Sequence, residues 1–510
     1  MKTQFSALQY YPHIAVLLVS ALLIRLLSLA LYPLMDTTEA RYGEMARLMS
    51  ETGNWLTPQF DYGVPFWGKP PLQNWLSASF IELFANNEFF LRLPHFLVGL
   101  VVLALVVKLA KKFAINGLTV ATVLTTTTVF YVCMGTVMTD MGLLLGLTLA
   151  LVGFYLAWQG AYFWGYAGFV GLAIGLMAKG PVAVAIFGIA TYLWMVWVVG
   201  PIKMWSQLWQ RVPLVSGLLL LLALTLPWYV MAEQATPGFI QYFIVGEHWS
   251  RFVDSGWKGD LYGTAHDEVR GTIWIYFAVA CVPWSLFIPR GLYRIYHKVN
   301  SIQTDHLYKS SLKHGNRNQV EQETNEQEVN GQEAIEQKTI EQKTRGFDDF
   351  TKFLLCWMTA PLILFTFAGN ILPAYVLPAS PALALLIAYA WRNSPIHRFM
   401  MIATCIPVLL VIALVVLNSG VSKDKSDKWL LSQRIYDLPV YYWLKQPFSS
   451  RYYSEGKALV VNDELQLNQL NQSQYYVVLS KRQLTEQGQF GECLLESETS
   501  KKVLMLCGED

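Results

Sequence analysis

The sequence predicts a polytopic α-helical membrane protein, with about eleven or more transmembrane helices and a small soluble α/β domain at the C-terminus. Of the 510 residues, 54% are hydrophobic and 15% are charged, whereas soluble domains carry about 25% charge. Several apolar runs reach the ~20 residues that a helix needs to cross a bilayer. After Asn418 the chain becomes polar, with short β-rich runs such as YDLPVYYWL and QYYVVLS. We therefore expect a membrane module at residues 1–418 and a soluble domain at 419–510.

Hydropathy places about eleven membrane spans along the module. The first span follows Lys2 and lacks a small-residue cleavage site, so we interpret it as a retained helix and not as a signal peptide. The expected spans lie near residues 14–31, 92–112, 118–136, 141–158, 162–178, 182–199, 213–229, 272–289, 352–369, 373–391 and 399–417.

Basic residues predict the orientation of these spans. If the spans alternate in direction, four basic clusters fall on the same side as Lys2, and that side is cytoplasmic by the positive-inside rule. The loops at 35–90 and 230–270 and the C-terminal domain then face outward, which in a bacterial inner membrane is the periplasm. The clusters are Lys108, Lys111 and Lys112; Lys203 and Arg211; Arg290, Arg294 and Lys298; and Arg392, His397 and Arg398.

Two further features concern domain organisation and redox state. Residues 300–346 are rich in Gln and Glu and repeat the letters IEQKT, so they cannot bury enough apolar surface to fold. We interpret them as a low-complexity cytoplasmic linker. Cys493 and Cys507 would form a disulfide if the C-terminal domain lies outside the cytoplasm, and would otherwise be two free thiols.

The first outward loop carries the densest group of charged and aromatic residues. It includes the stretch MDTTEARYGEMARLMSETGNWLTPQFDYGVPFWGKPPLQNWL, from Met35 to Leu76, between two apolar runs. Asp36 and Glu39 place carboxylates beside the cationic Arg41 and Lys69. Residues 38–50 can form an amphipathic helix on the membrane surface, and capping this helix is the alternative role for Asp36.

Other charged residues are expected at the same face. Asp140 stands between two apolar runs, where it is either functional or a helix cap. Lys179 precedes Gly180-Pro181, which is either a simple turn or a place for a cation beside an anionic group. The loop at 230–270 contains EHWSRF, with His248 and Arg251. His248 is a candidate base, metal ligand or plain hydrogen-bonding residue, because no spaced partner such as HExxH accompanies it.

Carboxylates beside cations at an outward face favour transfer of a group from a phosphate-linked donor. The cations would bind the phosphate and stabilise its charge as it leaves, and a carboxylate would take the proton from the acceptor hydroxyl. Walker-type and dinucleotide-binding glycine motifs are absent, as is a Cys/His zinc pattern. Because nucleotide-linked donors are scarce outside the cytoplasm, a polyprenyl-phosphate sugar fits this location. We expect a bilayer environment and no nucleic-acid partner.

Several motifs also resemble a known family. In order, TEARYGEMARLM, GNWLTP, VPFWGKPPL, VMTDM, AKGPVA, PWYV, PGFIQYFIVGEHWSRF and ILPAYVLPASPALALL resemble segments of the membrane glycosyltransferases that include the aminoarabinose transferases of lipid A, distant relatives of protein O-mannosyltransferases. The resemblance covers residues 10–400. It implies a GT-C fold and an inverting transfer of a sugar from undecaprenyl phosphate to lipid A or another envelope glycolipid at the periplasmic face.

The resemblance also implies roles for individual residues. The family's essential first-loop aspartate would stand at Thr38, so its role passes to the nearest aspartate, Asp36. Asp140 corresponds to a second essential carboxylate, and we include Glu39 as a third catalytic candidate. Donor-phosphate binding is implied for Arg41 and Lys69 and extended to Arg251, whereas His248, Tyr375 and Lys179 are candidate substrate-binding residues.

Two departures from the family pattern affect the cofactor and the sugar. In the family, a glutamate that can bind a metal together with the loop histidine stands at the position of Gly68. Its absence here weakens a prediction of zinc. A divalent cation stays an open alternative. Asn370 stands near the position of a lysine that precedes the Leu-Pro motif. A hexosamine or a hexose is therefore as well supported as aminoarabinose.

The sequence leaves two alternatives to this function. A protein O-glycosyltransferase that uses a polyprenyl-phosphate sugar would show the same motifs. A lipid transporter is less well supported, because such proteins show repeated halves and charged or broken helices at the bilayer midplane, and this chain has no internal repeat. We expect a multi-pass protein of the bacterial inner membrane, with a cytoplasmic N-terminus and a periplasmic C-terminus.

Overall fold

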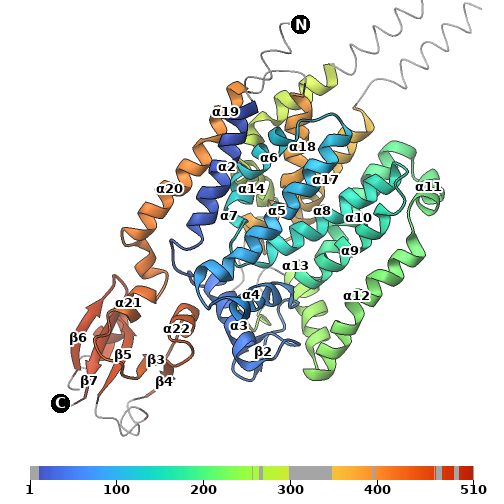
Figure 1. The fold of residues 1–510 in the computed structure, drawn as a ribbon. Helices are drawn as coiled ribbons and strands as arrows, with labels where there is room; N and C mark the ends of the chain where they lie inside the picture. Colours follow the sequence, from blue (N-terminus) through green and yellow to red (C-terminus); the bar gives the residue numbers. More distant parts are fainter. Residues whose placement is uncertain are drawn as a thin grey trace, which may run out of the picture.

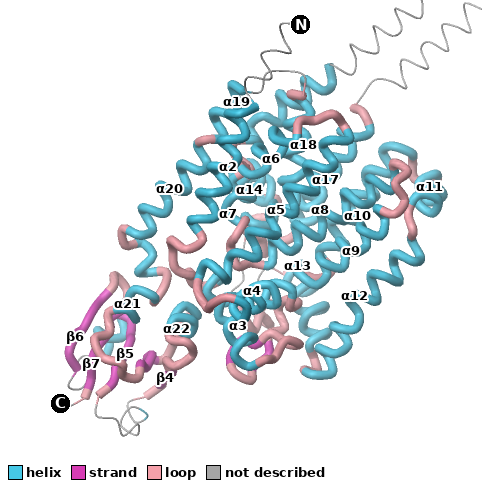
Figure 2. Tube along the Cα trace, in the orientation of Figure 1, coloured by secondary structure: helices cyan, strands magenta, loops and turns pink. Residues whose placement is uncertain are grey.

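The computed structural model describes residues 11–254, 257–263, 268–297, 347–392, 397–463, 466, 474–487 and 493–508. The expected linker at 300–346 lies outside these described residues. The chain forms an elongated helical bundle with a small sheet-containing domain at one end (Figure 1). Within the described residues, strands occur in this C-terminal domain and in one short hairpin beside the bundle, as Figure 2 shows.

The bundle confirms the predicted polytopic helical membrane fold. Among the described residues, seven helices are long and apolar enough to cross a bilayer, and a bent pair of helices makes an eighth. The main helices of the bundle are α2 (Tyr11–Ser28), α5 (Glu88–Lys112), α8 (Thr139–Trp158), α9 (Trp164–Ala178), α10 (Val182–Val199), α12 (Leu214–Ala235), α14 (Thr272–Ala280), α17 (Asp349–Thr366), α18 (Ser380–Ala390), α19 (His397–Ala403) and α20 (Cys405–Asn418).

The prediction of a continuous span at 118–136 is wrong, because the helix is interrupted. Helix α6 (Gly117–Thr125) ends and α7 (Thr128–Cys133) begins around a run of threonines. The hydroxyls of Thr126 and Thr127 donate to carbonyls one turn back, at 2.6 and 2.9 Å, so the side chains compete with the helical backbone. The freed amide of Thr128 donates to the Val282 carbonyl at 3.1 Å.

The expected span at 272–289 is bent at the same level of the bundle. Helix α14 is followed by the 3-10 turn η2 (Trp284–Phe287), and the chain there changes direction by 99°. Pro283 cannot donate a backbone hydrogen bond, so the helix does not continue through it. The Trp284 indole donates to the Thr126 hydroxyl at 3.0 Å, so the two interruptions pack against each other.

Glycines allow α8 and α9 to approach closely. A side chain at Gly146 of α8 would place its Cβ 2.5 Å from the backbone nitrogen of Gly175, and one at Gly153 would meet the backbone of Gly168 at 2.7 Å. Small residues at a helix contact are typical of membrane bundles, in which backbones pack directly on each other. This contact fixes the position of Lys179 at the end of α9.

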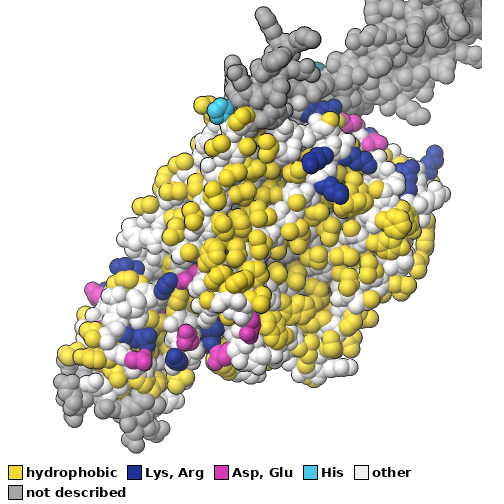
Figure 3. All heavy atoms as spheres, in the orientation of Figure 1, with side chains coloured by type: hydrophobic (Ala, Val, Ile, Leu, Met, Phe, Trp, Pro, Cys, Tyr) yellow, Lys and Arg dark blue, Asp and Glu magenta, His cyan; other side chains and the backbone are white. Residues whose placement is uncertain are grey.

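The basic residues gather at one end of the bundle. Arg211, at the end of α11 (Lys203–Arg211), lies over the Trp158 ring at the end of α8, and Lys108 of α5 lies over Trp164 at the start of α9. Arg294 contacts Trp391 beyond α18. Figure 3 shows one group of Lys and Arg side chains at the end opposite the C-terminal domain, others mixed with Asp and Glu on and beside that domain, and a broad hydrophobic band between.

The loop at 35–90, which we expect to face outward, folds against the other end of the bundle. It contains α3 (Thr38–Thr52), a hairpin of β1 (Gln59–Asp61) and β2 (Val64–Pro65), and α4 (Leu72–Leu83). Helix α3 is buried over most of its length, which differs from the expected surface amphipathic helix. The face of α3 that was expected to be exposed is buried, because the C-terminal domain and the loop after α12 cover it.

The C-terminal domain confirms the expected small α/β fold. Its sheet has the strand order β4-β3-β5-β7-β6, and β4, β3 and β5 run parallel while β7 and β6 are antiparallel to their neighbours. A disulfide joins Cys493 of β6 to Cys507 of β7, as one of the two sequence alternatives predicts. The elements are α21 (Lys428–Ser432), β3 (Val440–Trp443), α22 (Phe448–Tyr453), β4 (Leu459–Val461), β5 (Tyr475–Ser480), α24 (Lys481–Gln487), β6 (Cys493–Glu498) and β7 (Lys502–Cys507).

Helix α22 attaches this domain to the first outward loop through a group of polar contacts that we call the docking cluster. Its membrane-module residues are Asp36, Asp61 and Glu88. Arg451 forms an ion pair with Asp61 at 2.6 Å, and the Tyr453 hydroxyl donates to Glu88 at 2.9 Å. Glu88 also pairs with Lys428, and Asp36 accepts hydrogen bonds from Ser449.

Candidate active site

A cavity of about 350 Å³ opens where the first loop, the segment after α12 and the α17–α18 connection meet. Its polar lining comes from residues far apart in the sequence, and Val182, Phe252, Leu364 and Phe365 provide much of its apolar wall. The polar lining residues are Lys69, Lys179, Glu247, His248, Arg251, Asn370 and Tyr375. A cavity of this size with an apolar wall and a few converging polar groups is typical of a ligand site.

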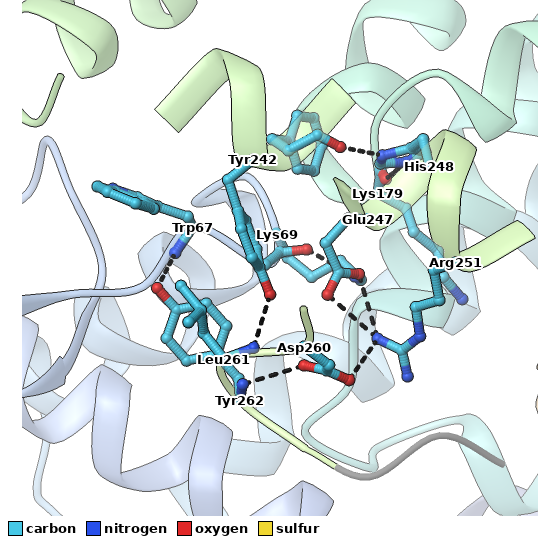
Figure 4. Close-up of polar contacts among 12 residues, drawn as sticks. Trp67, Lys69, Lys179, Tyr242, Glu247, His248, Arg251, Asp260, Leu261 and Tyr262 are labelled. Atoms are coloured by element: carbon cyan, nitrogen blue, oxygen red, sulfur yellow. Dashed lines mark hydrogen bonds and ion pairs between the residues drawn. The ribbon is translucent and has the colours of Figure 1, made fainter. Parts of the chain in front are cut away.

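The centre of the site is a carboxylate between two cations (Figure 4). The Lys69 ammonium donates to Glu247 at 2.8 Å, and the Arg251 guanidinium donates to both Glu247 oxygens at 3.1 and 3.2 Å. Burial opposes the charge on Glu247, but the two cations outweigh burial and hold the pKa of this carboxyl below its usual value. Arg251 also lies 3.4 Å from Asp260.

A second ion pair stands beside this group. The Lys179 ammonium donates to Asp140 at 2.7 Å, and both side chains are more than nine-tenths buried. Asp140 lies in the first turn of α8, where the helix dipole favours a negative charge. Lys179 also lies 4.3 Å from the centre of the Tyr375 ring. We call Lys69, Glu247, Arg251, Lys179 and Asp140 the pocket cluster.

His248 is held by backbone carbonyls. Its Nδ1 lies 2.7 Å from the Phe243 carbonyl and its Nε2 lies 3.2 Å from the Lys179 carbonyl. Burial, aided by the charge of Lys69, lowers the pKa of His248. The residue lies in η1 (Gln241–Ser250), a π-helix, and its contact five residues back follows from that wider winding. His248 therefore joins η1 to the end of α9 at the edge of the cavity.

Arg41 lies near the cavity but does not line it. Its guanidinium donates to the Tyr262 carbonyl at 2.7 Å and lies 5.8 Å from the centre of the Phe66 ring. Its Nε is buried and has no hydrogen-bond partner among the described residues. Tyr262 in turn donates to the Pro65 carbonyl at 3.0 Å, so Arg41 and Tyr262 join the first loop to the loop after α12.

The structure does not bring Asp36 or Glu39 into the cavity. Asp36 accepts a hydrogen bond from the Ser449 amide at 3.0 Å and another from the Ser449 hydroxyl, and burial raises its pKa although these bonds oppose the shift. Glu39 accepts two hydrogen bonds from the Arg92 guanidinium, both at 2.8 Å, in a buried pair. Both carboxylates of the EARY motif region are thus engaged in contacts that hold elements together.

Sequence reasoning missed two carboxylates of the site. Glu247 and Asp260 were not among the candidate residues, although both face Arg251. The available signal for Glu247 was its position four residues before Arg251, which places the two side chains on one helical face. No comparable signal existed for Asp260, because its place depends on how the loop at 257–263 folds against η1.

The site residues do not fit a metal ion. Within the described part of the chain, no three His, Cys, Asp or Glu side chains come together in a way that could hold one. Both ring nitrogens of His248 face carbonyl oxygens. At Gly68, the position of the family's glutamate, a Cβ would lie 2.7 Å from the Phe66 ring. We therefore derive no step through a metal.

Comparisons with known proteins confirm the predicted fold. The chain superimposes on ArnT from Cupriavidus metallidurans bound to undecaprenyl phosphate with a TM-score of 0.71 at 16% identity, over 97% of this chain and 98% of that chain. The apo state of the same protein gives a TM-score of 0.67 at 17% identity, over the same shares of both chains. The fold is thus that of the GT-C membrane proteins.

Sequence comparisons show which proteins within this class the chain is similar to. Residues 15–243 match the family model described as dolichyl-phosphate-mannose-protein mannosyltransferase. The undecaprenyl phosphate-alpha-4-amino-4-deoxy-L-arabinose arabinosyl transferase of Enterobacter sp. (strain 638) is 27% identical over 73% of this chain, and that of Erwinia tasmaniensis is 26% identical over 71%. The matches span 58% and 56% of those relatives. The predicted resemblance to GT-C glycosyltransferases of the aminoarabinose transferase type is confirmed.

Proposed function

We propose that this protein is an inverting glycosyltransferase that moves a sugar from undecaprenyl phosphate to lipid A or another envelope glycolipid. The observation that carries the proposal is the placement of Lys69 and Arg251 on either side of Glu247 in the cavity. Both cations line the cavity, and a phosphate group could take over the contacts that they make with Glu247. The names of the similar proteins support undecaprenyl phosphate as the lipid carrier.

The lining of the cavity supports specific roles. Lys69 and Arg251 bind the donor phosphate and stabilise its negative charge when the bond to the sugar breaks. Phe365 and Leu364 provide an apolar surface for the first part of the lipid tail. Lys179, oriented by Asp140 and the Tyr375 ring, places a third ammonium or guanidinium group at the cavity. Arg41 and His248 hold the two outward loops in the arrangement that forms the cavity.

We propose that Glu247 accepts the proton of the acceptor hydroxyl. It is ionised over the physiological range because the adjacent cations lower its pKa, and it lines the cavity. Carboxylates are common general bases. When a phosphate takes over the contacts of Lys69 and Arg251, Glu247 loses the groups that lower its pKa, so its basicity rises upon donor binding.

The same proposal includes a location. The end of the bundle with the basic residues would face the cytoplasm, according to the positive-inside rule. The cavity and the C-terminal domain would then lie in the periplasm, with the whole protein in the bacterial inner membrane. The Cys493–Cys507 disulfide supports an oxidising compartment for the C-terminal domain.

The test is a mass spectrum of lipid A from cells with the gene, without it, and with the Lys69→Ala variant. A sugar-sized mass that depends on the gene and is absent with the variant is the expected result, and its size distinguishes a pentosamine, a hexosamine and a hexose. The exposed Lys258 of the neighbouring loop provides a control variant, Lys258→Ala, which should retain the mass. Identical spectra from cells that express the protein would contradict lipid A as the acceptor.

A protein acceptor is the second candidate, because the family model that matches residues 15–243 carries the name of a protein mannosyltransferase. Glycopeptide analysis of envelope proteins from the same cells tests it. Glycopeptides that depend on the gene and on Lys69, with unchanged lipid A, would favour this alternative.

A further inference from the structure

The C-terminal domain contains a second cavity, separate from the active-site cavity. Its volume is about 280 Å³, which lies just below the ~300 Å³ lower end of small-molecule sites and suits a ligand the size of one sugar. It lies at the carboxyl ends of β3 and β5, and its lining residues are Tyr442, Trp443, Lys445, Pro447, Val478, Leu479, Ser480, Gln483 and Lys502.

The topology of the sheet explains why a crevice forms there. The chain leaves β3 through α22 and returns to β4 on one side of β3, then crosses to β5 on the other side. The connection after β3 therefore runs toward β4, at one edge of the sheet, and the connection after β5 runs toward β6, at the other edge. The two connections leave the neighbouring strands β3 and β5 in opposite directions. In open α/β sheets, ligands bind in the crevice at this point, outside the carboxyl ends of the strands.

The charges of the crevice favour an anion. Lys445 is exposed, and its ammonium makes no ion pair among the described residues. Lys502 enters from β7 and is held by the buried Asp427 at 2.6 Å, which also accepts from Tyr442 at 2.9 Å. This arrangement orients one lysine rigidly and leaves the other free to close on a ligand.

Neutral polar groups complete the lining. The Ser480 hydroxyl donates to the Gln483 side chain at 2.8 Å and accepts from the Gln483 backbone amide at 3.2 Å, which leaves one lone pair of the hydroxyl oxygen for a ligand. Donors and acceptors of this kind, with apolar walls from Val478 and Leu479, suit the hydroxyls and carbon face of a sugar.

We infer that this crevice binds a phosphorylated sugar, with the phosphate on Lys445 and Lys502 and the sugar against the joined side chains of Ser480 and Gln483. Asp427, which orients Lys502, lies a short distance after α20, the last apolar helix. The crevice therefore stands where the chain leaves the membrane, and the head group of a membrane-borne glycolipid is one source of such a ligand. A soluble sugar phosphate is the other source, and it has the same chemistry.

The test is calorimetric titration of the full-length, detergent-solubilised protein with glucose 1-phosphate, and with glucose as the uncharged control. We expect binding of glucose 1-phosphate alone, and a loss of about tenfold in affinity for Lys445→Ala, because a charge-assisted contact to phosphate is removed. Lys457→Ala is the matched control, since Lys457 is 81% exposed in the same domain and does not line the crevice. Equal binding of glucose, or unchanged affinity in Lys445→Ala, would overturn the inference.

A further variant separates this inference from the proposed function. The Lys69→Ala protein lacks the phosphate contact of the active-site cavity and should still bind glucose 1-phosphate at the crevice with unchanged affinity. Loss of binding in Lys69→Ala together with unchanged binding in Lys445→Ala would place the ligand in the active-site cavity and overturn the inference. Competition by a phosphorylated glycolipid in nanodiscs, with phosphatidylcholine nanodiscs as the control, identifies a lipid source. The absence of such competition identifies a soluble source.

Discussion

The pocket cluster and the docking cluster both contain carboxylates from segments that face the same end of the bundle, but their surroundings differ. Glu247 of the pocket cluster faces two cations and lines a cavity. Asp36 of the docking cluster faces the hydroxyl and amide of Ser449, inside a contact between two domains. Carboxylates at one end of the bundle thus occur in two settings, a cavity and a contact between domains, and we expect chemistry only in the cavity.

The pKa shifts of the two carboxylates show the same contrast. Cations lower the pKa of Glu247 in spite of burial, whereas burial raises the pKa of Asp36 in spite of its hydrogen bonds. The charge of Glu247 is compensated by opposite charges, whereas Asp36 is satisfied by hydrogen bonds from Ser449. The following variants test this division.

The largest effect is expected from Glu39→Gln, which leaves the buried guanidinium of Arg92 without its counter-charge. Breaking a buried pair in this way costs about 3–5 kcal/mol of stability. We expect a clearly lower melting temperature in detergent, with normal turnover in the protein that remains folded. Glu51→Gln is the control, because the side chain of Glu51 is 48% exposed. A stable but inactive Glu39→Gln protein would instead assign catalysis to Glu39.

The next effect is that of Lys69→Ala on turnover. The variant removes a cation from the place where the leaving phosphate gains charge, and loss of one such group lowers kcat by about 10²–10³. Folding should be preserved, because Lys69 lies on a loop and Glu247 keeps Arg251 as a partner. Turnover of a polyprenyl-phosphate sugar by purified protein measures this effect, with Lys258→Ala as the control. Turnover that equals the wild type would remove Lys69 from the active site.

A smaller effect on turnover is expected from Asp36→Asn. The asparagine oxygen can still accept from Ser449, so the domains remain attached, and turnover should fall by less than tenfold, or about 1.4 kcal/mol. The family motif predicts the opposite result, a loss of turnover with normal expression. Comparison with Ser449→Ala decides the matter. If both variants lower the melting temperature alone, Asp36 is a docking residue; if only Asp36→Asn abolishes turnover, the motif-based assignment is correct.

The sequence was sufficient for the class of fold because composition and periodicity act locally. Each of the eleven expected spans falls on a helix or a pair of helices, and the C-terminal sheet and disulfide follow from short β-rich runs and two cysteines. The breaks at Thr126 and Pro283 were missed because each is stabilised by the other. A hydropathy window contains no information about such a partner.

The site was predictable only in part, for the same reason. Lys69, Lys179, Arg251, His248 and Tyr375 were all expected, and all line the cavity. Asp36 is a catalytic candidate through the family resemblance, and its contact with Ser449 could not be predicted, because Ser449 is 413 residues away in a domain with no recognisable motif. Glu247 was left out because a carboxylate beside a histidine carries no signal until Lys69 is seen to face it.

The smallest effect concerns pH and compares the two clusters directly. For Asp36, whose pKa is raised in the folded protein, the contribution to stability is complete below the ordinary value of 3.8 and decreases as pH rises through the raised pKa. For Glu247, whose pKa is lowered, the contribution is complete above the ordinary value of 4.5 and decreases as pH falls through the lowered pKa. For each variant we take the melting temperature of the wild type minus that of the variant. With rising pH this difference should become smaller for Asp36→Asn and larger for Glu247→Gln. Parallel slopes for the two variants would contradict the division between the docking cluster and the pocket cluster.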